Sequence, residues 1–150
     1  MTRSDAQIYD EVKDDLVRYA TALVGPHDAA DVVSAVIVRV LAKRPLASLA
    51  EPRPYLFRAV LNEAATIRRR TVRAVPLEPI AAVDEPNLRP EVLSAVMDLP
   101  VQQRAATFLF YWAGHTVAET ALLMDIGEGT AKRYLSLARN TLKGVLHARA

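Results

Sequence analysis

Cysteine is absent from this chain of 150 residues, so disulfides and thiolate metal sites are excluded. Glycine is scarce, with five in all, and long stretches lack both glycine and proline, which favours helices over sheets. No run of about 18 apolar residues occurs, so we expect no membrane insertion. Residues 1–15 are acidic and polar, without the apolar segment of a signal peptide. We therefore expect a cytoplasmic protein.

Few groups in the sequence are suited to catalysis. His27, His115 and His147 are far apart and lack the spacing of metal ligands. Phosphate-binding glycine loops, dinucleotide-binding motifs and nucleophile elbows are missing. Adjacent carboxylates such as Asp14 and Asp15 point apart on a helix, and we expect both to be solvated. The sequence thus predicts no enzyme, no metal and no cofactor.

Charge is segregated along the chain although the net charge is only +2. Residues 43–73 carry eight basic and two acidic side chains, and residues 101–150 carry six basic and three acidic. Residues 1–42 and 74–100 are net acidic. The basic zones could hold a polyanion, because lysine and arginine release counterions on meeting phosphate. Charge alone fits an uneven solvated surface equally well.

Apolar spacing predicts three helices in the first half. The first, about 6–24, carries apolar residues at steps of three and four, and Gly25-Pro26 ends it. The second follows Asp28, whose carboxylate is expected to cap it, and runs to Lys43. The third starts near Pro54 and ends in a run of arginines. The residues expected to point inward are Ile8, Val12, Leu16, Tyr19, Leu23, Val32, Val33, Val36, Val40, Leu41, Leu56, Ala59, Val60, Ala64 and Ile67.

Residues 74–88 are rich in proline and acidic side chains, which predicts a linker. Helices of about 90–98 and 100–113 follow, and Trp112, next to Phe110 and Tyr111, is expected in the core. We predict an all-α fold. Two small helical domains, 1–73 and 89–150, would be joined by the linker, and the second would be a helix-turn-helix domain.

The helix-turn-helix is predicted from Thr116 onward. Thr116 and Glu119 fit a capping box, residues 125–127 read as a turn, and a longer helix begins at Glu128 or Gly129. An apolar face and a basic, hydroxyl-bearing face run side by side along this helix. The apolar face consists of Ala131, Leu135, Ala138 and Leu142, and the basic one of Lys132, Ser136, Arg139 and Lys143.

Thr130, Lys132 and Arg133 lie in the first turn of that helix, the part that reaches base edges when such a helix enters a major groove. Lysine and arginine there can donate to guanine or to phosphate. An ordinary amphipathic helix pair with a solvated polar face is the alternative that the pattern leaves open.

The segments L-P-V-Q-Q-R (99–104), T-V-A-E-T-A (116–121) and I-G-E-G-T-A-K-R-Y-L-S-L-A-R-N-T-L (126–142) resemble region 4 of extracytoplasmic-function (ECF) sigma factors. The resemblance implies that this domain binds the promoter −35 element. The implied DNA-binding residues are Arg104, Thr130, Lys132, Arg133, Ser136 and Arg139. The sequence departs from the family at Gly127, Tyr134 and Leu137, which implies a weaker or differently specified −35 contact.

The first half is similar to sigma region 2. A-A-D-V-V-S-A-V-I-V-R-V (29–40) resembles the helix that docks on the polymerase clamp, which implies polymerase binding by Asp31, Val32, Ser34, Ala35, Val38 and Arg39. P-Y-L-F-R-A-V-L-N (54–62) and the arginines after it resemble the helix that flanks the −10 element. The implied −10 residues are Arg53, Tyr55, Phe57, Arg58, Asn62, Arg68 and Arg69. Loop 44–53 corresponds to the segment that receives a flipped base.

The resemblance implies a sigma factor that directs RNA polymerase to promoters by −10 melting and −35 recognition. The implied partners are core RNA polymerase, promoter DNA and an anti-sigma factor, which commonly holds members of the family inactive. Ser34 and Ala35 stand where the family has glutamine followed by an acidic residue. This departure leaves open an alternative, a sigma-like DNA-binding regulator or interaction module that no longer binds core polymerase.

Overall fold

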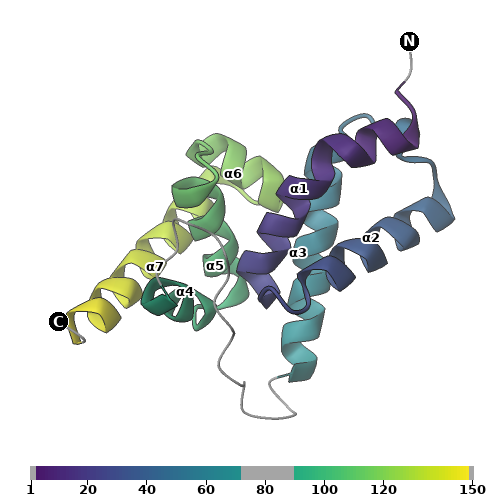
Figure 1. Cartoon of the computed structure of the whole chain (residues 1–150). Coiled ribbons are helices and arrows are strands. Elements are labelled where there is room, and N and C mark those ends of the chain that lie inside the picture. The colour runs from purple at the N-terminus through teal and green to yellow at the C-terminus, as the bar shows by residue number, and fades with distance from the viewer. Residues whose placement is uncertain (1–2, 72–89, 149–150) are drawn as a thin grey trace.

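The structure, a computed structural model, describes residues 3–71 and 90–148, and side chains over residues 3–67 and 94–144. Every regular element in this part is helical, which confirms the predicted all-α class (Figure 1). The first half contains α1 (Asp5–Val24), α2 (Ala29–Lys43), the short 3-10 helix η1 (Leu46–Ser48) and α3 (Pro52–Thr71). The second contains α4 (Pro90–Met97), α5 (Val101–Thr107), the π-helical turn η2 (Phe108–Trp112), α6 (Val117–Met124) and α7 (Glu128–Ala148). The predicted linker lies outside the described residues.

The ends of α1 follow from local chemistry. Ser4 forms a capping box with Gln7: the Gln7 N–H donates to the Ser4 hydroxyl at 3.2 Å, and the Ser4 N–H donates to the Gln7 side chain at 2.9 Å. Gly25 ends the helix at a φ of 91°, a conformation that glycine adopts without strain. The predicted cap at Asp28 is wrong, because its side chain makes no cap hydrogen bond. Its backbone is already helical rather than extended, and an extended backbone is what aims a capping side chain at the free amides.

α1 packs against both α2 and α3 and buries the predicted stripe from Ile8 to Leu23. Val32, Val33, Val36 and Val40 of α2 are buried as predicted. Leu41 is not: 43% of it is exposed, because α2 turns its 36–37–40 edge inward and position 41 falls outside that edge. Among the residues that the structure describes, no helix is both long and apolar enough to traverse a bilayer.

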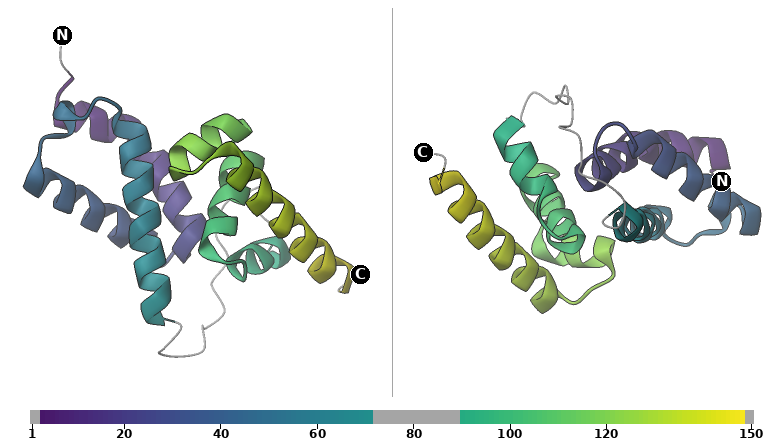
Figure 2. Two further views of the ribbon diagram at one scale, coloured as in Figure 1. Left: turned by 180° about the vertical axis from the view of Figure 1, so that it is seen from behind. Right: turned by 90° about the horizontal axis from the view of Figure 1, so that it is seen from below.

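The two halves pack together through α1 and α3 on one side and α4, α5 and α6 on the other (Figure 2). Tyr19 of α1 stacks on Phe57 of α3, with ring centroids 4.9 Å apart, and lies 6.1 Å from the ring of Phe108 in the second half. One continuous core therefore includes apolar side chains from both halves, among them Leu109, Leu123 and Met124. Burial of this shared surface holds the helix-turn-helix against α3.

The helix that carries the aromatic run changes character at Phe108. The Ala113 N–H donates to the Phe108 carbonyl at 2.9 Å, a five-residue step that makes η2 a π-helical turn. Phe108 and Leu109 are buried, whereas 46% of Tyr111 is exposed. Trp112, the residue predicted to be core, is half-buried and packs against the core.

Candidate nucleic-acid interface

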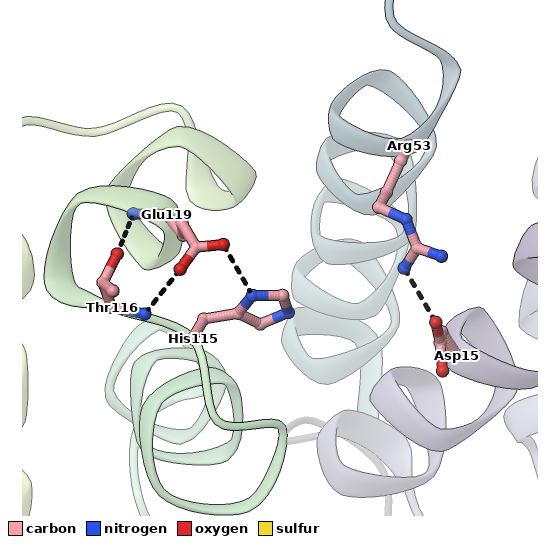
Figure 3. A network of polar contacts seen from close by, with 5 residues as sticks. All are labelled: Asp15, Arg53, His115, Thr116 and Glu119. Atoms are coloured by element: carbon pink, nitrogen blue, oxygen red, sulfur yellow. Dashed lines mark hydrogen bonds and ion pairs between the residues drawn. The ribbon is translucent and has the colours of Figure 1, made fainter.

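The start of α6 is fixed by the predicted capping box (Figure 3). The Glu119 N–H donates to the Thr116 hydroxyl at 3.1 Å, and the Thr116 N–H donates to the Glu119 carboxylate at 3.0 Å. That main-chain hydrogen bond, helped by the Thr116 side chain and by His115, lowers the pKa of Glu119. The capping box fixes where α6 begins, and the start of α6 helps to set the position of α7.

The turn between α6 and α7 is held by Asp125, which is left-handed at a φ of 57°. Aspartate tolerates this conformation better than most residues. The Ala131 N–H then donates to the Gly127 carbonyl at 3.0 Å, and α7 runs from Glu128 as predicted. A two-turn helix, a short turn and a long helix are therefore observed at the predicted positions.

The two faces of α7 separate as predicted. Ala131, Leu135 and Ala138 are buried against the rest of the second half. The predicted −35 residues on the same helix are all exposed: Thr130, Lys132, Arg133, Ser136 and Arg139. We call these five residues the cationic edge of α7. Because they face solvent, a duplex can reach them in this arrangement of the chain.

A groove of about 490 Å³ runs beside the cationic edge. Phe110 and Tyr111, whose rings meet edge to face at 5.0 Å, form one wall. The opposite wall is α7, and the full lining is Phe110, Tyr111, Val117, Gly129, Lys132, Arg133, Leu135, Ser136 and Arg139. Sequence reasoning missed Tyr111 because a residue spacing of 3.6 cannot anticipate a π-helical turn.

A second basic pocket, of about 250 Å³, lies between α2 and α3. It brings together three of the predicted −10 residues, Tyr55, Arg58 and Asn62, with Arg39 of the predicted polymerase set. Arg39 also donates to Glu63 at 3.0 Å. Lys43 completes the basic lining and was not among the predicted residues, although its place at the end of α2, within the basic zone 43–73, was a usable signal.

Two arginines of the predicted −10 set are engaged within the protein. Arg53 pairs with Asp15 of α1 at 2.8 Å, as Figure 3 shows. Arg58 donates to the main-chain carbonyl of Leu122 at 3.2 Å and lies 3.7 Å from the carboxylate of Asp125. Arg68 and Arg69 belong to the last turns of α3, and their side chains lie outside the described part of the structure.

Three predicted site residues are corrected by their burial. Arg104 is fully buried, and its guanidinium donates to four main-chain carbonyls, those of Leu23, Val96, Met97 and Leu99, so no duplex can reach it. Phe57 is 2% exposed because its ring stacks on Tyr19, which leaves no face for a base. Val32 is 2% exposed because it lies on the inner side of α2, and it is closed to a polymerase.

The outer side of α2 is open. Asp31, Ser34, Ala35, Val38 and Arg39 are all exposed, so the predicted polymerase set without Val32 shares one face. Val38 is 67% exposed, more than any other large apolar side chain in the described part of the chain.

Comparison with known protein families finds a match for the second half of the chain. Residues 89–142 match the family model of sigma-70 region 4. These residues are therefore similar to sigma-70 region 4, and we call them the region 4 domain. Its helix-turn-helix, α6 and α7, lies within the matched residues. The cationic edge of α7 is therefore an edge of the region 4 domain.

Relatives extend the similarity beyond the region 4 domain. The chain is 35% identical over 99 residues to the ECF RNA polymerase sigma factor SigM of Mycobacterium tuberculosis, in strains Erdman and H37Rv. The match covers 61% of this chain, and the chain spans 50% of the length of those relatives. The predicted resemblance to ECF sigma factors is thereby confirmed.

Solved structures share the fold of both halves. The sigma factor RpoE of Bartonella quintana, solved with the anti-sigma factor NepR, superposes with a TM-score of 0.76 at 24% identity, covering 95% of this chain and 96% of that one. CnrH, solved with the cytosolic domain of CnrY, has a TM-score of 0.66 at 19% identity, covering 97% and 89%. The helices that precede the region 4 domain are thus arranged as in RpoE and CnrH.

Proposed function

We propose that this protein is a sigma factor of the ECF type, which directs RNA polymerase to specific promoters. The observation that carries the proposal is the exposed cationic edge of α7, on the second helix of a helix-turn-helix within a region 4 domain. In this role the protein breaks no bond. It supplies binding energy and specificity to another enzyme, and it acts in the cytoplasm, where polymerase is found.

The −35 element is the proposed ligand of the cationic edge. Lys132 and Arg133 lie in the first two turns of α7, where a recognition helix meets base edges. Arginine and lysine at such positions pair with the acceptors of guanine, and residues farther along, such as Arg139, meet phosphate. Gly129 and Ser136 have small side chains and line the groove beside Tyr111, where we expect a sugar-phosphate backbone to approach.

The −10 element is the proposed ligand of the pocket between α2 and α3. Tyr55 is 38% exposed there and offers a ring on which a single-stranded base can stack. Arg39, Lys43 and Arg58 surround it with positive charge that can hold the strand's phosphates. A base leaving the duplex costs a few kcal/mol of stacking, which contacts of this kind would offset.

Core RNA polymerase is the proposed partner of the outer face of α2, through Asp31, Ser34, Ala35, Val38 and Arg39. An anti-sigma factor is a further proposed partner. RpoE, solved with the anti-sigma factor NepR, and CnrH, solved with the cytosolic domain of CnrY, both share their fold with this chain.

Transcription from a promoter library with purified core polymerase tests the proposal. Promoter-dependent transcripts that need the added protein would support it. DNA binding without any transcript would favour the alternative, a DNA-binding regulator that no longer engages polymerase, for which Ser34 and Ala35 are the motivating residues. If the protein gave no transcripts and bound no DNA, both readings would be overturned.

A matched pair of variants sharpens the test. Replacing Val38 by glutamate places a charge at the centre of the outer face of α2, and it should abolish transcription while leaving DNA binding intact. Replacing Asp14, an exposed residue of α1, by alanine serves as the control and should change neither. Equal transcription from both variants would show that the outer face of α2 does not bind polymerase.

A further inference from the structure

The loop of residues 44–51 borders the basic pocket between α2 and α3. It begins directly after Lys43 and ends ahead of Tyr55, and both of these residues line the pocket. Leu46 and Leu49 are buried in the core beneath the loop. The exposed side chains of the loop are Arg44, Pro45, Ser48, Ala50 and Glu51. A single strand seated in the pocket would therefore pass the open side of this loop.

Two carboxylates of α1 are bonded to this region. The Ala47 N–H, in η1, donates to Oδ1 of Asp5 at 2.9 Å, although the two residues are 42 positions apart in the chain. Ten residues farther along α1, Asp15 accepts from Nη1 of Arg53 at 2.8 Å, in the first turn of α3 (Figure 3). α1 is thus bonded to one point inside the loop and to one point just beyond it.

The other contacts of the loop leave its orientation open. Within η1, the N–H groups of Ser48 and Leu49 donate to the carbonyls of Pro45 and Leu46, both at 3.1 Å. These hydrogen bonds shape the turn but do not connect it to another element. Burial of the two leucines favours contact with the core without prescribing a direction. The hydrogen bond to Asp5 is directional, so it fixes how the turn faces the pocket.

Arg53, a residue of the predicted −10 set, has both of its partners within the protein. Its guanidinium carbon lies 5.8 Å from the centroid of the Phe57 ring, within cation–π range, while Nη1 bonds to Asp15. Asp15 also lies 3.9 Å from Arg18 on the same helix. A guanidinium engaged on a carboxylate and a ring orients the first turn of α3, which carries Tyr55.

We propose that Asp5 and Asp15 are positioning residues for −10 recognition, which hold the loop and the start of α3 in place before a base arrives. Arg53 acts through Asp15 and does not contact the strand. A loop that must be ordered during binding costs conformational entropy and adapts to any base, whereas an ordered loop presents one shape. The inference rests on the proposed function, because it assigns roles within that −10 site.

Transcription with the full chain, purified core polymerase and a promoter library randomised at −10 and −35 tests the role of Asp5. Asp5→Ala should lower discrimination between bases at the most selective −10 position by about fivefold or more, the weight of one read base pair. Selectivity at −35 should not change. Asp5→Asn keeps a side-chain oxygen that can accept from the Ala47 N–H, so it should resemble the parent. Asp14→Ala, on exposed α1, is the matched control.

Hydrogen exchange measures the positioning itself. The Ala47 amide should exchange faster in Asp5→Ala than in the parent, and Asp5→Asn should restore most of its protection. Unchanged exchange in Asp5→Ala would overturn the proposal, as would faster exchange with unaltered −10 discrimination. An equal loss of selectivity at −10 and −35 would also overturn it, because it would indicate general damage to the fold.

A double-mutant cycle tests the role of Arg53. Asp15→Ala, Arg53→Ala and their combination should lower −10 discrimination by about the same factor, because all three remove one contact. If Arg53 touched the strand, Asp15→Ala would release it and leave −10 discrimination intact while Arg53→Ala lost it, and the positioning role would be overturned. Absence of promoter-dependent transcripts with the parent would instead overturn the proposed function, and this inference with it.

Discussion

Arg104 of α5 donates a hydrogen bond to the main-chain carbonyl of Leu23, across the boundary between the two halves. Its other bonds reach Val96 at 3.1 Å and Met97 and Leu99 at 2.6 Å, where α4 ends. The carbonyls at the end of α4 lack partners within their own helix, and one buried guanidinium satisfies them. Arg104 thus closes α4 and ties it to α1, a structural role in place of the predicted contact with DNA.

Replacing Arg104 by alanine should lower the free energy of unfolding by about 3 kcal/mol or more, because several buried carbonyls lose a charged donor together. Urea unfolding followed by circular dichroism measures the change. Arg133→Ala, the same substitution on the exposed side of α7, should alter stability by no more than about 0.5 kcal/mol. Equal stability of the two variants would contradict the structural role of Arg104.

Features that depend only on neighbouring residues were predicted correctly from the sequence. The capping box at Thr116 and the division of α7 into two faces are contained within a few turns of sequence, and both are confirmed. The burial of Arg104 could not be predicted in this way. Its partners include a main-chain carbonyl 81 residues away, and a main-chain carbonyl has no signature in the sequence.

The same limit applies to Phe57. On a helix covered on one side, the stripe through Leu56 and Val60 would leave Phe57 near its margin. α3 is instead packed by α1 and α2 and also by α5 and α6, so Phe57 and Leu61 are buried too. Sequence periodicity describes one buried face, whereas contact between the halves creates a second.

Arg133 and Lys143 should contribute differently to binding of the −35 element. Arg133→Ala should weaken binding to the preferred −35 duplex by about 1–3 kcal/mol and relax the preference at one position, if Arg133 pairs with a base. Lys143→Ala should weaken binding to all sequences alike and reduce the salt slope by about one, because it lies farther along α7 where phosphate is in reach. Fluorescence anisotropy at several salt concentrations distinguishes the two. Loss of affinity without change of preference in Arg133→Ala would show that Arg133 meets phosphate only.

Tyr19→Phe should stabilise the protein by about 1 kcal/mol. Burial raises the pKa of Tyr19, and its hydroxyl has no hydrogen-bond partner among the described residues, so folding removes it from water without compensation. Phenylalanine keeps the ring contacts with Phe57 and Phe108 and omits the hydroxyl. Chemical denaturation provides the measurement. Destabilisation by more than about 1 kcal/mol would mean that the hydroxyl makes a favourable contact in solution.

Acid should weaken the cap of α6 through Glu119. The hydrogen bond from the Thr116 main chain, with smaller effects of the Thr116 side chain and His115, lowers the pKa of Glu119 in the folded protein. A folded-state pKa below the unfolded one means that the carboxylate stabilises the fold fully above the ordinary value, 4.5, and that this contribution is lost as pH falls through the lower folded-state pKa. Glu119→Gln keeps an acceptor for the Thr116 N–H and does not titrate. Melting temperatures from about pH 7 to about pH 3 should therefore favour the parent over Glu119→Gln near neutrality, with the difference vanishing in acid, because every other carboxylate titrates in both proteins. A difference that stayed constant over this range would show that the charge of Glu119 does not contribute to the cap.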